Sequence, residues 1–117
     1  MATNRRSIGK KYEEQAARYL ESKGYEVLER NYHSRYGEID LIARDCDGTI
    51  IFIEVKGRAN SHFGYGAEAV TSAKCQKIRR TAQQYIYEKG LHWDGNFRYD
   101  VIVIENRKME HMVNAFY

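Results

Sequence analysis

Hydrophobic positions return with a helical period in two stretches of the chain. In residues 7–23 apolar and small side chains recur every three or four positions, and Gly24 follows as a helix stop signal. A second stripe begins at Ala67 or Thr71, runs to Lys89 and is closed by Gly90. Its members are Cys75, Ile78, Ala82, Tyr85 and Ile86. The pattern predicts two helices.

Elsewhere apolar and polar residues alternate, as they do in β-strands. Residues 37–44 and 49–56 predict two strands joined by the turn sequence Asp45-Cys46-Asp47-Gly48. Further strands are predicted at 25–29, at 97–104 and near 109–116, with loops at 31–36 and 57–66. The order α-β-β-β-α-β-β predicts an α/β fold, with one mixed β-sheet flanked by helices, in a single domain spanning residues 1–117.

The turn fixes how the two central strands face each other. If Cys46, Asp47 and Gly48 form a three-residue loop with Gly48 in the left-handed conformation, Asp45 faces Thr49. Counting back, Ile42 faces Phe52, Asp40 faces Glu54, and Glu38 faces Lys56. Directly opposed residues share a face of the sheet. The other face is then wholly apolar, with Ile39, Leu41, Ala43, Ile51, Ile53 and Val55.

Two carboxylates, Asp40 and Glu54, are thereby expected side by side with Lys56 next to them. Opposed like charges destabilise a sheet, and a divalent cation between them would let both ionise. Mg²⁺ commonly uses one or two carboxylates together with substrate phosphates. An ordinary solvated face would carry the same residues, but Ile42 and Phe52 share this face and indicate that something covers it.

Glu13 and Lys74 each allow two interpretations. Glu13 lies on the inward stripe of the first helix, among the small or apolar residues Gly9, Ala16, Ala17 and Leu20, where a carboxylate is out of place. It either reaches the charged face or extends to water at the helix edge. Lys74, at the start of the second helix, is either a phosphate contact near the site or one more exposed lysine.

Composition and charge add a mild preference for a phosphate-bearing partner. The 117 residues are 43% hydrophobic and 30% charged, which is typical of a globular protein, and the net charge is +3. Basic residues crowd the N-terminus and the second helix, and residues 32–36 interleave cations with aromatic rings, which suits a nucleic-acid backbone or stacked bases. The expected contacts are Arg35, Lys74, Lys77 and Arg80; a solvated helix face is the alternative for the helical ones.

A cytoplasmic location is expected. The N-terminal sequence MATNRRSIGKKYEEQ has no apolar segment of the kind found in signal peptides. No run approaches the roughly 18 apolar residues that a membrane helix needs. Cys46 and Cys75 lie outside any CxxC or Cys/His cluster, so both are interpreted as reduced, structural thiols.

Nearly the whole chain resembles the bacterial YraN family, which is grouped with the PD-(D/E)xK nucleases and is similar to archaeal Holliday-junction resolvases. The segments that carry the resemblance are GKKYEEQAARYL, NYHSRYGEIDLIARD, IFIEVKGR, FGYGAEAV and FRYDVI. The resemblance implies a restriction-endonuclease-like fold. Its motif positions fall on Glu13, Asp40, Glu54 and Lys56. One departure is Tyr12, where the family often has glycine.

The resemblance also implies a chemistry. Mg²⁺ or Mn²⁺ would be held by Asp40, Glu54 and the backbone carbonyl of Val55, while Lys56 orients water or stabilises developing charge and Glu13 completes the site or positions a second ion. The expected activity is metal-dependent hydrolysis of phosphodiester bonds in DNA, including branched or junction DNA. Resolving a junction takes two symmetric cuts, which would require a homodimer. A non-cleaving nucleic-acid-binding module, or an interaction domain in DNA processing, is the alternative.

Overall fold

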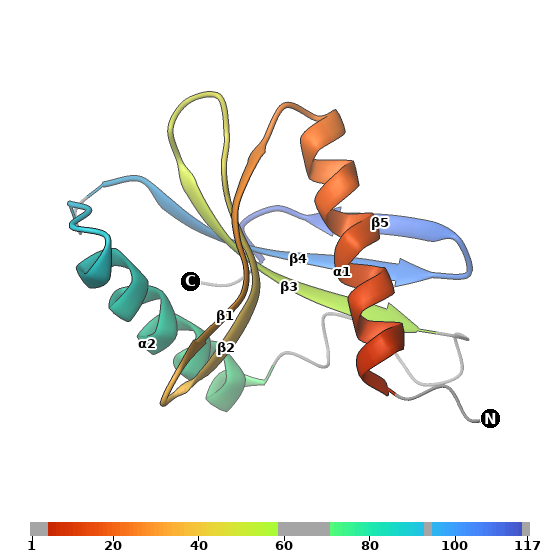
Figure 1. Ribbon diagram of the computed structural model, residues 1–117, viewed down its shortest axis with the longest axis horizontal. Coiled ribbons are helices and arrows are strands. Elements are labelled where there is room, and N and C mark those ends of the chain that lie inside the picture. Colours follow the sequence, from red (N-terminus) through yellow and green to blue (C-terminus); the bar gives the residue numbers. More distant parts are fainter. Residues whose placement is uncertain (1–4, 59–70, 93–94, 116–117) are drawn as a thin grey trace.

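The computed structural model describes residues 5–58, 71–92 and 95–115. The expected glycine loop therefore lies, beyond residue 58, outside the described residues. The elements are α1 (Arg5–Ser22), β1 (Glu26–Ser34), β2 (Gly37–Arg44), β3 (Ile50–Arg58), α2 (Ser72–Glu88), β4 (Phe97–Glu105) and β5 (Lys108–Met112). This order is the predicted one, and the predicted mixed sheet flanked by helices is confirmed (Figure 1).

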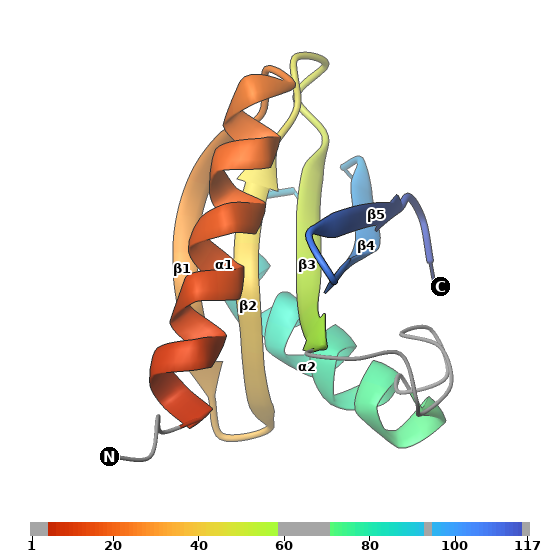
Figure 2. The ribbon, with the colours of Figure 1, turned by 90° about the vertical axis from the view of Figure 1, so that its right-hand side faces the viewer.

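The five strands lie in the sheet in chain order, from β1 to β5. All neighbours are antiparallel except β3 and β4, which run parallel because the chain crosses over through α2 between them. Figure 2 shows α1 in front of one face of the sheet and α2 behind it. The carboxyl end of β3, the β1–β2 turn and the starts of both helices lie toward the same end of the molecule (Figures 1 and 2).

Each helix buries its predicted stripe against one face of the sheet. On the first face Ala16, Ala17 and Leu20 of α1 are fully buried. Their partners in the sheet are Leu41, Ala43, Ile51, Ile53, Ile102 and Ile104. On the second face Ile78, Ala82, Tyr85 and Ile86 of α2 pack against Ile39, Ile42, Ile50 and Phe52. Both predicted helical stripes are confirmed, and α2 is what covers the Ile42–Phe52 face.

The predicted register of the β2–β3 hairpin is confirmed from the turn as far as the pair Leu41–Ile53, and the predicted pairs Asp40–Glu54 and Glu38–Lys56 lie beyond the end of the ladder. Ile42 pairs with Phe52, and Gly48 has a φ of +88°, in the left-handed region. The amide N–H groups of Asp47 and Thr49 both donate to Oδ1 of Asp45, at 2.9 Å, so the first residue of the turn closes it with its own side chain.

Three predictions about the β1–β2 region are wrong. The segment from residue 31 is not a loop, because β1 passes through Asn31, in a left-handed conformation (φ 53°), and ends at Ser34. Ile39 packs on the α2 face rather than with Leu41. Glu38 contacts His33, at 3.3 Å, and not Lys56.

The corrections at Ile39 and Glu38 have one cause. The β2–β3 ladder reaches only as far as the pair Leu41–Ile53, whereas β2 stays paired with β1 down to Gly37. Beyond Leu41 the β1–β2 ribbon therefore leaves β3, and strict alternation no longer decides which helix a residue of β2 meets. Val55, on the other side of the separation, is only partly buried for the same reason.

Candidate active site and its charged borders

Asp40 lies at the point where β2 separates from β3. Its Oδ2 accepts a hydrogen bond from the amide of Val55, at 2.8 Å. A side chain thus connects β2 to β3 where the backbone hydrogen bonds between the two strands end. Asp40 and Glu54 are each only 7% exposed. Two buried carboxylates thus stand at the end of the hairpin ladder, as the register predicts.

Glu54 is held by two lysines. Its Oε1 lies 3.4 Å from Nζ of Lys56 and 2.6 Å from Nζ of Lys74. Lys74 belongs to the first turn of α2, where its amide donates to the side-chain oxygen of the N-cap residue Thr71. Of the two interpretations of Lys74, the structure therefore supports the one that places it at the site.

The charges of this cluster are unequally shared. Burial, followed by the neighbouring carboxylate of Glu54, raises the pKa of Asp40 to about 8. Burial and the adjacent ammonium of Lys74 lower the pKa of Lys56. Burial also acts to lower the pKa of Lys74, but the bond to Glu54, the neighbouring Lys56 and the charges of Glu54 and Asp40 together outweigh it, and the pKa of Lys74 is raised. Glu54 has cationic partners, whereas Asp40 has a backbone amide.

Glu13 reaches the edge of the cluster from α1. Burial raises the pKa of its carboxyl group, a hydrogen bond from Asn31 acts against that shift, and the charges of Glu38 and Glu54 add to it. The bend of β1 at Asn31 thus brings a polar partner to Glu13. Glu13 is only partly buried, at the edge of the stripe that Ala16, Ala17 and Leu20 bury completely.

Tyr12, the departure from the family pattern, packs against β3. A Cβ atom on Gly57 would lie 1.9 Å from Cδ2 of the Tyr12 ring, which no real structure tolerates. The aromatic ring therefore occupies space that glycine leaves free, one residue beyond Lys56. The neighbouring residue of α1, Glu13, is held beside the cluster by this contact.

The donor set fits a divalent cation of the Mg²⁺ type. Within the described ranges, no three His, Cys, Asp or Glu side chains gather closely enough to cage a metal by themselves. Mg²⁺ does not need such a cage, because it often takes one or two carboxylates and completes its shell with water and substrate phosphate. Asp40 and Glu54 meet that requirement, and burial, followed by the charge of Glu54, raises the pKa of Asp40, so a cation beside it would favour its ionised form.

A basic border lies on one side of this cluster. Arg35 and Tyr36 of the β1–β2 turn line a shallow pocket of about 350 Å³ together with Lys77 and Arg80 of α2. The structure thus brings together the expected nucleic-acid contacts Arg35, Lys77 and Arg80. Lys74 lies one helical turn before Lys77, and links this border to the carboxylates.

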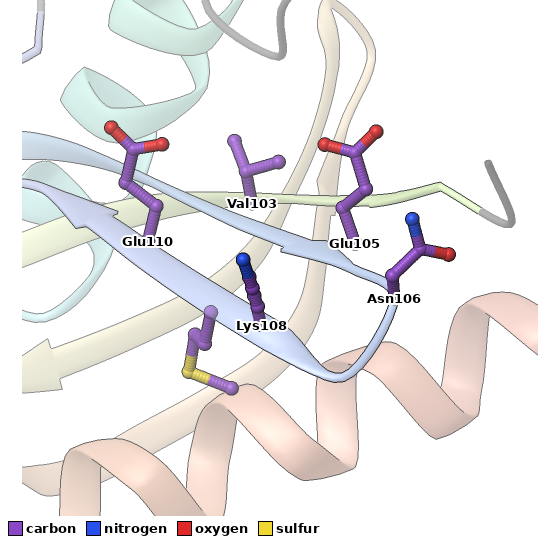
Figure 3. Close-up of a pocket in the computed structure, with 6 residues that line it drawn as sticks. Val103, Glu105, Asn106, Lys108 and Glu110 are labelled. Carbon is purple, nitrogen blue, oxygen red and sulfur yellow. The ribbon is translucent and has the colours of Figure 1, made fainter. Parts of the chain in front are cut away.

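An acidic border lies on the other side. Lys56 pairs in register with Val103, and Val103 with Glu110, so these three residues share a row on the α2 face of the sheet. Figure 3 shows Glu110, Val103 and Glu105 projecting from the same face of the β4–β5 hairpin. They line a pocket of about 460 Å³ with Asn106, Lys108 and Met109.

A third buried carboxylate was not predicted from the sequence. Asp100 of β4 is fully buried and accepts two hydrogen bonds from the guanidinium of Arg98, both at 2.9 Å. His111 Nε2 lies 2.6 Å from its Oδ2, and the amide of Asn114 donates to its Oδ1. The available signal was an aspartate inside the apolar strand FRYDVIVIE, the same kind of interruption that drew attention to Asp40.

Comparison with known proteins places this carboxylate–lysine domain in a family. Residues 12–104 match the model of the uncharacterised protein family UPF0102. A UPF0102 protein of Sulfurihydrogenibium sp. is 49% identical, covering 92% of each chain, and one of Persephonella marina is 42% identical, covering 92% of this chain and 91% of that protein. The chain belongs to UPF0102, the YraN family, as its motifs predicted.

Among solved structures, the chain is similar to a repair endonuclease from Pyrococcus abyssi, with 18% identity and a TM-score of 0.48, over 90% of this chain and 39% of that one. Neither helix that the structure describes combines the length and the apolar character needed to cross a membrane.

Proposed function

We propose that the protein is a divalent-metal-dependent nuclease that hydrolyses phosphodiester bonds in DNA, with Asp40, Glu54 and Lys56 as its reactive groups. The observation that carries the proposal is the buried pair of carboxylates beside a half-buried lysine. Burial and a like charge raise the pKa of Asp40 to about 8, an arrangement that costs folding energy and is typical of functional sites. A purely structural carboxylate would gain a cationic partner.

Each residue of the cluster has a role in this proposal. Asp40, Glu54 and the carbonyl of Val55 would hold Mg²⁺ or Mn²⁺, and the Val55 amide fixes the orientation of Asp40. A cation bound there supplies positive charge that offsets the charge of the phosphate and makes water more acidic. Lys56, whose pKa burial lowers, would orient water or stabilise the negative charge that develops on the phosphate.

Glu13 and Lys74 support the same reaction from the two helices. Glu13 would complete the metal site or position a second ion, since its carboxyl group already senses Glu54. Lys74 would exchange its 2.6 Å contact with Glu54 for an oxygen of the substrate phosphate. The basic border would contact the DNA backbone. The family resemblance favours junction or branched DNA as the substrate. Two symmetric cuts in a junction would require a homodimer, and we place the reaction in the cytoplasm.

Cleavage and metal binding can be tested separately. Labelled DNA and RNA of linear, branched and junction form should be incubated with Mg²⁺ or Mn²⁺, and we expect cleavage of DNA by the wild type and none by Asp40→Ala. Metal should also raise the melting temperature of the wild type, since a ligand at about 100 times its dissociation constant adds roughly 2.7 kcal/mol. Lys56→Ala should lose cleavage yet keep that increment, because an ammonium cannot ligate a cation.

A non-cleaving nucleic-acid-binding or interaction module is the second candidate. The pairing of Glu54 with two lysines favours it, because an occupied carboxylate is a weaker metal ligand. This candidate becomes the better account if Mn²⁺ leaves the melting temperature of the wild type unchanged and Asp40→Ala unfolds the protein. Asp40 would then be a structural residue whose role is to hold the Val55 amide.

A further inference from the structure

Within the part of the chain that the structure describes, the cations of the basic border have no carboxylate partner. Among the ion pairs of the described residues, Lys74 of α2 and Lys89 directly after α2 each contact a glutamate, but Lys77, Arg80 and Arg35 form none. Gathering like charges in one pocket costs free energy unless an anion enters it. The pocket is therefore suited to an anionic group.

The β1–β2 turn is fixed on α2, which makes the pocket a built feature. The hydroxyls of Ser34 and Thr81 lie 2.7 Å apart, and Thr81 is fully buried. The amide of Tyr36 donates to the same Ser34 oxygen, at 3.0 Å. A Cβ atom on Gly37 would lie 3.6 Å from Cβ of Lys77, so the turn is in direct contact with the helix.

Tyr36 holds two guanidinium groups within the pocket. The guanidinium of Arg35 lies 5.1 Å from the centroid of its ring and that of Arg80 lies 5.5 Å from it. Arg35 also donates to the phenol oxygen, at 3.0 Å. The ring offsets part of the repulsion between the two cations. Guanidinium groups held in this way match the geometry of phosphate, which they bind through paired hydrogen bonds.

The pocket lies at a defined spacing from the carboxylate cluster. Lys74 touches Glu54, and Arg80 follows six residues later on the same helix. At 1.5 Å per residue, this is about 9 Å along the helix axis. Phosphates of one DNA strand advance by about 3.4 Å per nucleotide along a duplex. If α2 lies along the axis of the bound duplex, the pocket is two to three nucleotides away from a phosphate that is bound at the cluster.

The acidic border restricts the direction in which a strand can leave the cluster. Glu105 and Glu110 project from the β4–β5 hairpin on the far side of Lys56 (Figure 3). Lys108 pairs in register with Glu105 and offsets part of this charge, but one carboxylate stays in excess and repels a phosphate backbone, so a strand that is bound at Lys56 is directed toward α2 and the β1–β2 turn.

We propose that Arg35, Lys77 and Arg80, arranged around Tyr36, form a phosphate clamp that grips one nucleic-acid strand two to three nucleotides from the bond that is cut at Asp40 and Glu54. The position of the clamp relative to the cut rests on the proposed nuclease function. The capacity of the clamp to bind a strand does not.

Strand binding without metal tests the clamp itself. The affinity for a labelled single-stranded oligonucleotide should be measured by fluorescence anisotropy over a range of salt concentrations. The logarithm of the affinity should fall linearly with the logarithm of the salt concentration. Arg35→Ala and Arg80→Ala should each weaken binding about tenfold, and each should reduce the slope by about 0.7, the value for one lost contact to a single strand. Tyr36→Ala should weaken binding as well, whereas Tyr36→Phe, which keeps the ring, should bind more tightly than Tyr36→Ala.

Lys23→Ala is the matched control. Lys23 is an exposed lysine at the opposite end of the molecule, after α1, where its ammonium lies 5.9 Å from the ring of Tyr19. It should leave the affinity and the salt slope unchanged. If Arg35→Ala and Arg80→Ala behave like Lys23→Ala, the clamp does not exist.

Oligonucleotides with a single neutral methylphosphonate linkage test the position of the clamp. In the wild type, the substitution should slow cleavage most when it lies two or three nucleotides from the cut. Arg80→Ala should be insensitive to the substitution there, and Lys23→Ala should keep the sensitivity. An equal response of Arg80→Ala and the wild type would overturn the assigned spacing. Binding that depends on Arg35 and Arg80 without any cleavage would instead overturn the nuclease function and keep the clamp.

Discussion

Strands β2 and β4 each carry one buried aspartate within an apolar sequence, and their surroundings differ. Asp100 is fully buried, with a guanidinium, an imidazole and a backbone amide around its two oxygens. Asp40 is 7% exposed, with one backbone amide and the carboxylate of Glu54 as a neighbour. The surroundings of Asp100 place opposite charges in contact, whereas those of Asp40 bring a like charge close to it.

The two pKa values move in opposite directions. Burial acts to raise the pKa of Asp100, but hydrogen bonds from His111, Arg98 and the Asn114 amide outweigh it and hold this pKa below its usual range. Burial and Glu54 raise the pKa of Asp40 to about 8. Burial alone therefore does not distinguish a structural carboxylate from a functional one; the distinction lies in whether the fold also supplies the counter-charge.

The largest expected loss of stability is at Asp100. Asp100→Asn removes the charge that Arg98 and His111 surround, and breaking a buried pair costs about 3–5 kcal/mol. Urea unfolding of the metal-free protein at neutral pH should show that loss. Asp47→Asn, in the exposed β2–β3 turn, is the control and should change stability by less than about 0.5 kcal/mol. A loss at Asp100 no larger than that would break the comparison.

His111 should contribute the next largest effect. Its imidazole lies 2.6 Å from Asp100 and 3.0 Å from the hydroxyl of Tyr19, and it meets the Tyr19 ring edge-on. His111→Phe keeps the ring contact and removes both polar ones, for a cost of about 1.5–3 kcal/mol. His33→Phe, at an exposed imidazole beside Glu38, should leave the unfolding free energy almost unchanged.

Removing the charge of Asp40 should raise the stability of the metal-free protein, in contrast to Asp100→Asn, and the size of the gain should depend on pH. A carboxyl group whose pKa is raised in the folded state stabilises the fold below its unfolded pKa, near 3.9, and that contribution is lost as pH rises through about 8. Without metal, the wild type should therefore lose stability relative to Asp40→Asn between about pH 4 and 8, by at most about 1.4 kcal/mol per pH unit. A gap that stays constant with pH would show that Asp40 is not held protonated by its surroundings.

The smallest effect is expected where a carboxylate and a cation meet in solvent. Arg44 and Glu26 form an ion pair between β2 and β1 with both side chains about half exposed. Glu26→Gln should change the unfolding free energy by at most about 0.5 kcal/mol, because solvent screens exposed pairs. Thermal melting at low and high salt would measure it. A loss as large as that at His111 would mean that pairing, without burial, sets the stability of this sheet.

The hairpin could be predicted from the sequence because its register is decided locally. Gly48 takes the left-handed conformation that a three-residue turn requires, and that single choice aligns Ile42 with Phe52. The course of β1 could not be predicted in the same way. An asparagine at position 31 is typical of a loop, and its conformation is indeed left-handed. The strand continues because β1 stays paired with β2 on both sides of Asn31.

The composition of the candidate site was predictable, but its charge balance was not. Asp40 and Glu54 followed from strand register, whereas the contact of Lys74 with Glu54 depends on where the crossover places the start of α2. The Asp100 network was missed because, apart from Arg98 of the same strand, its partners come from β5, from Tyr25 after α1 and from the chain beyond β5. No pattern within one strand reveals such partners.

The contact between Tyr12 and Gly57 links two positions of the sequence that local patterns treat as independent. Because the ring of Tyr12 lies where a Cβ atom of residue 57 would be, every substitution at one position changes the set of residues that the other accepts. A relative with glycine at the position of Tyr12 has room for a side chain opposite it. Across the family, the two positions are therefore expected to vary together, and exchanging either residue alone between relatives should harm folding more than exchanging both.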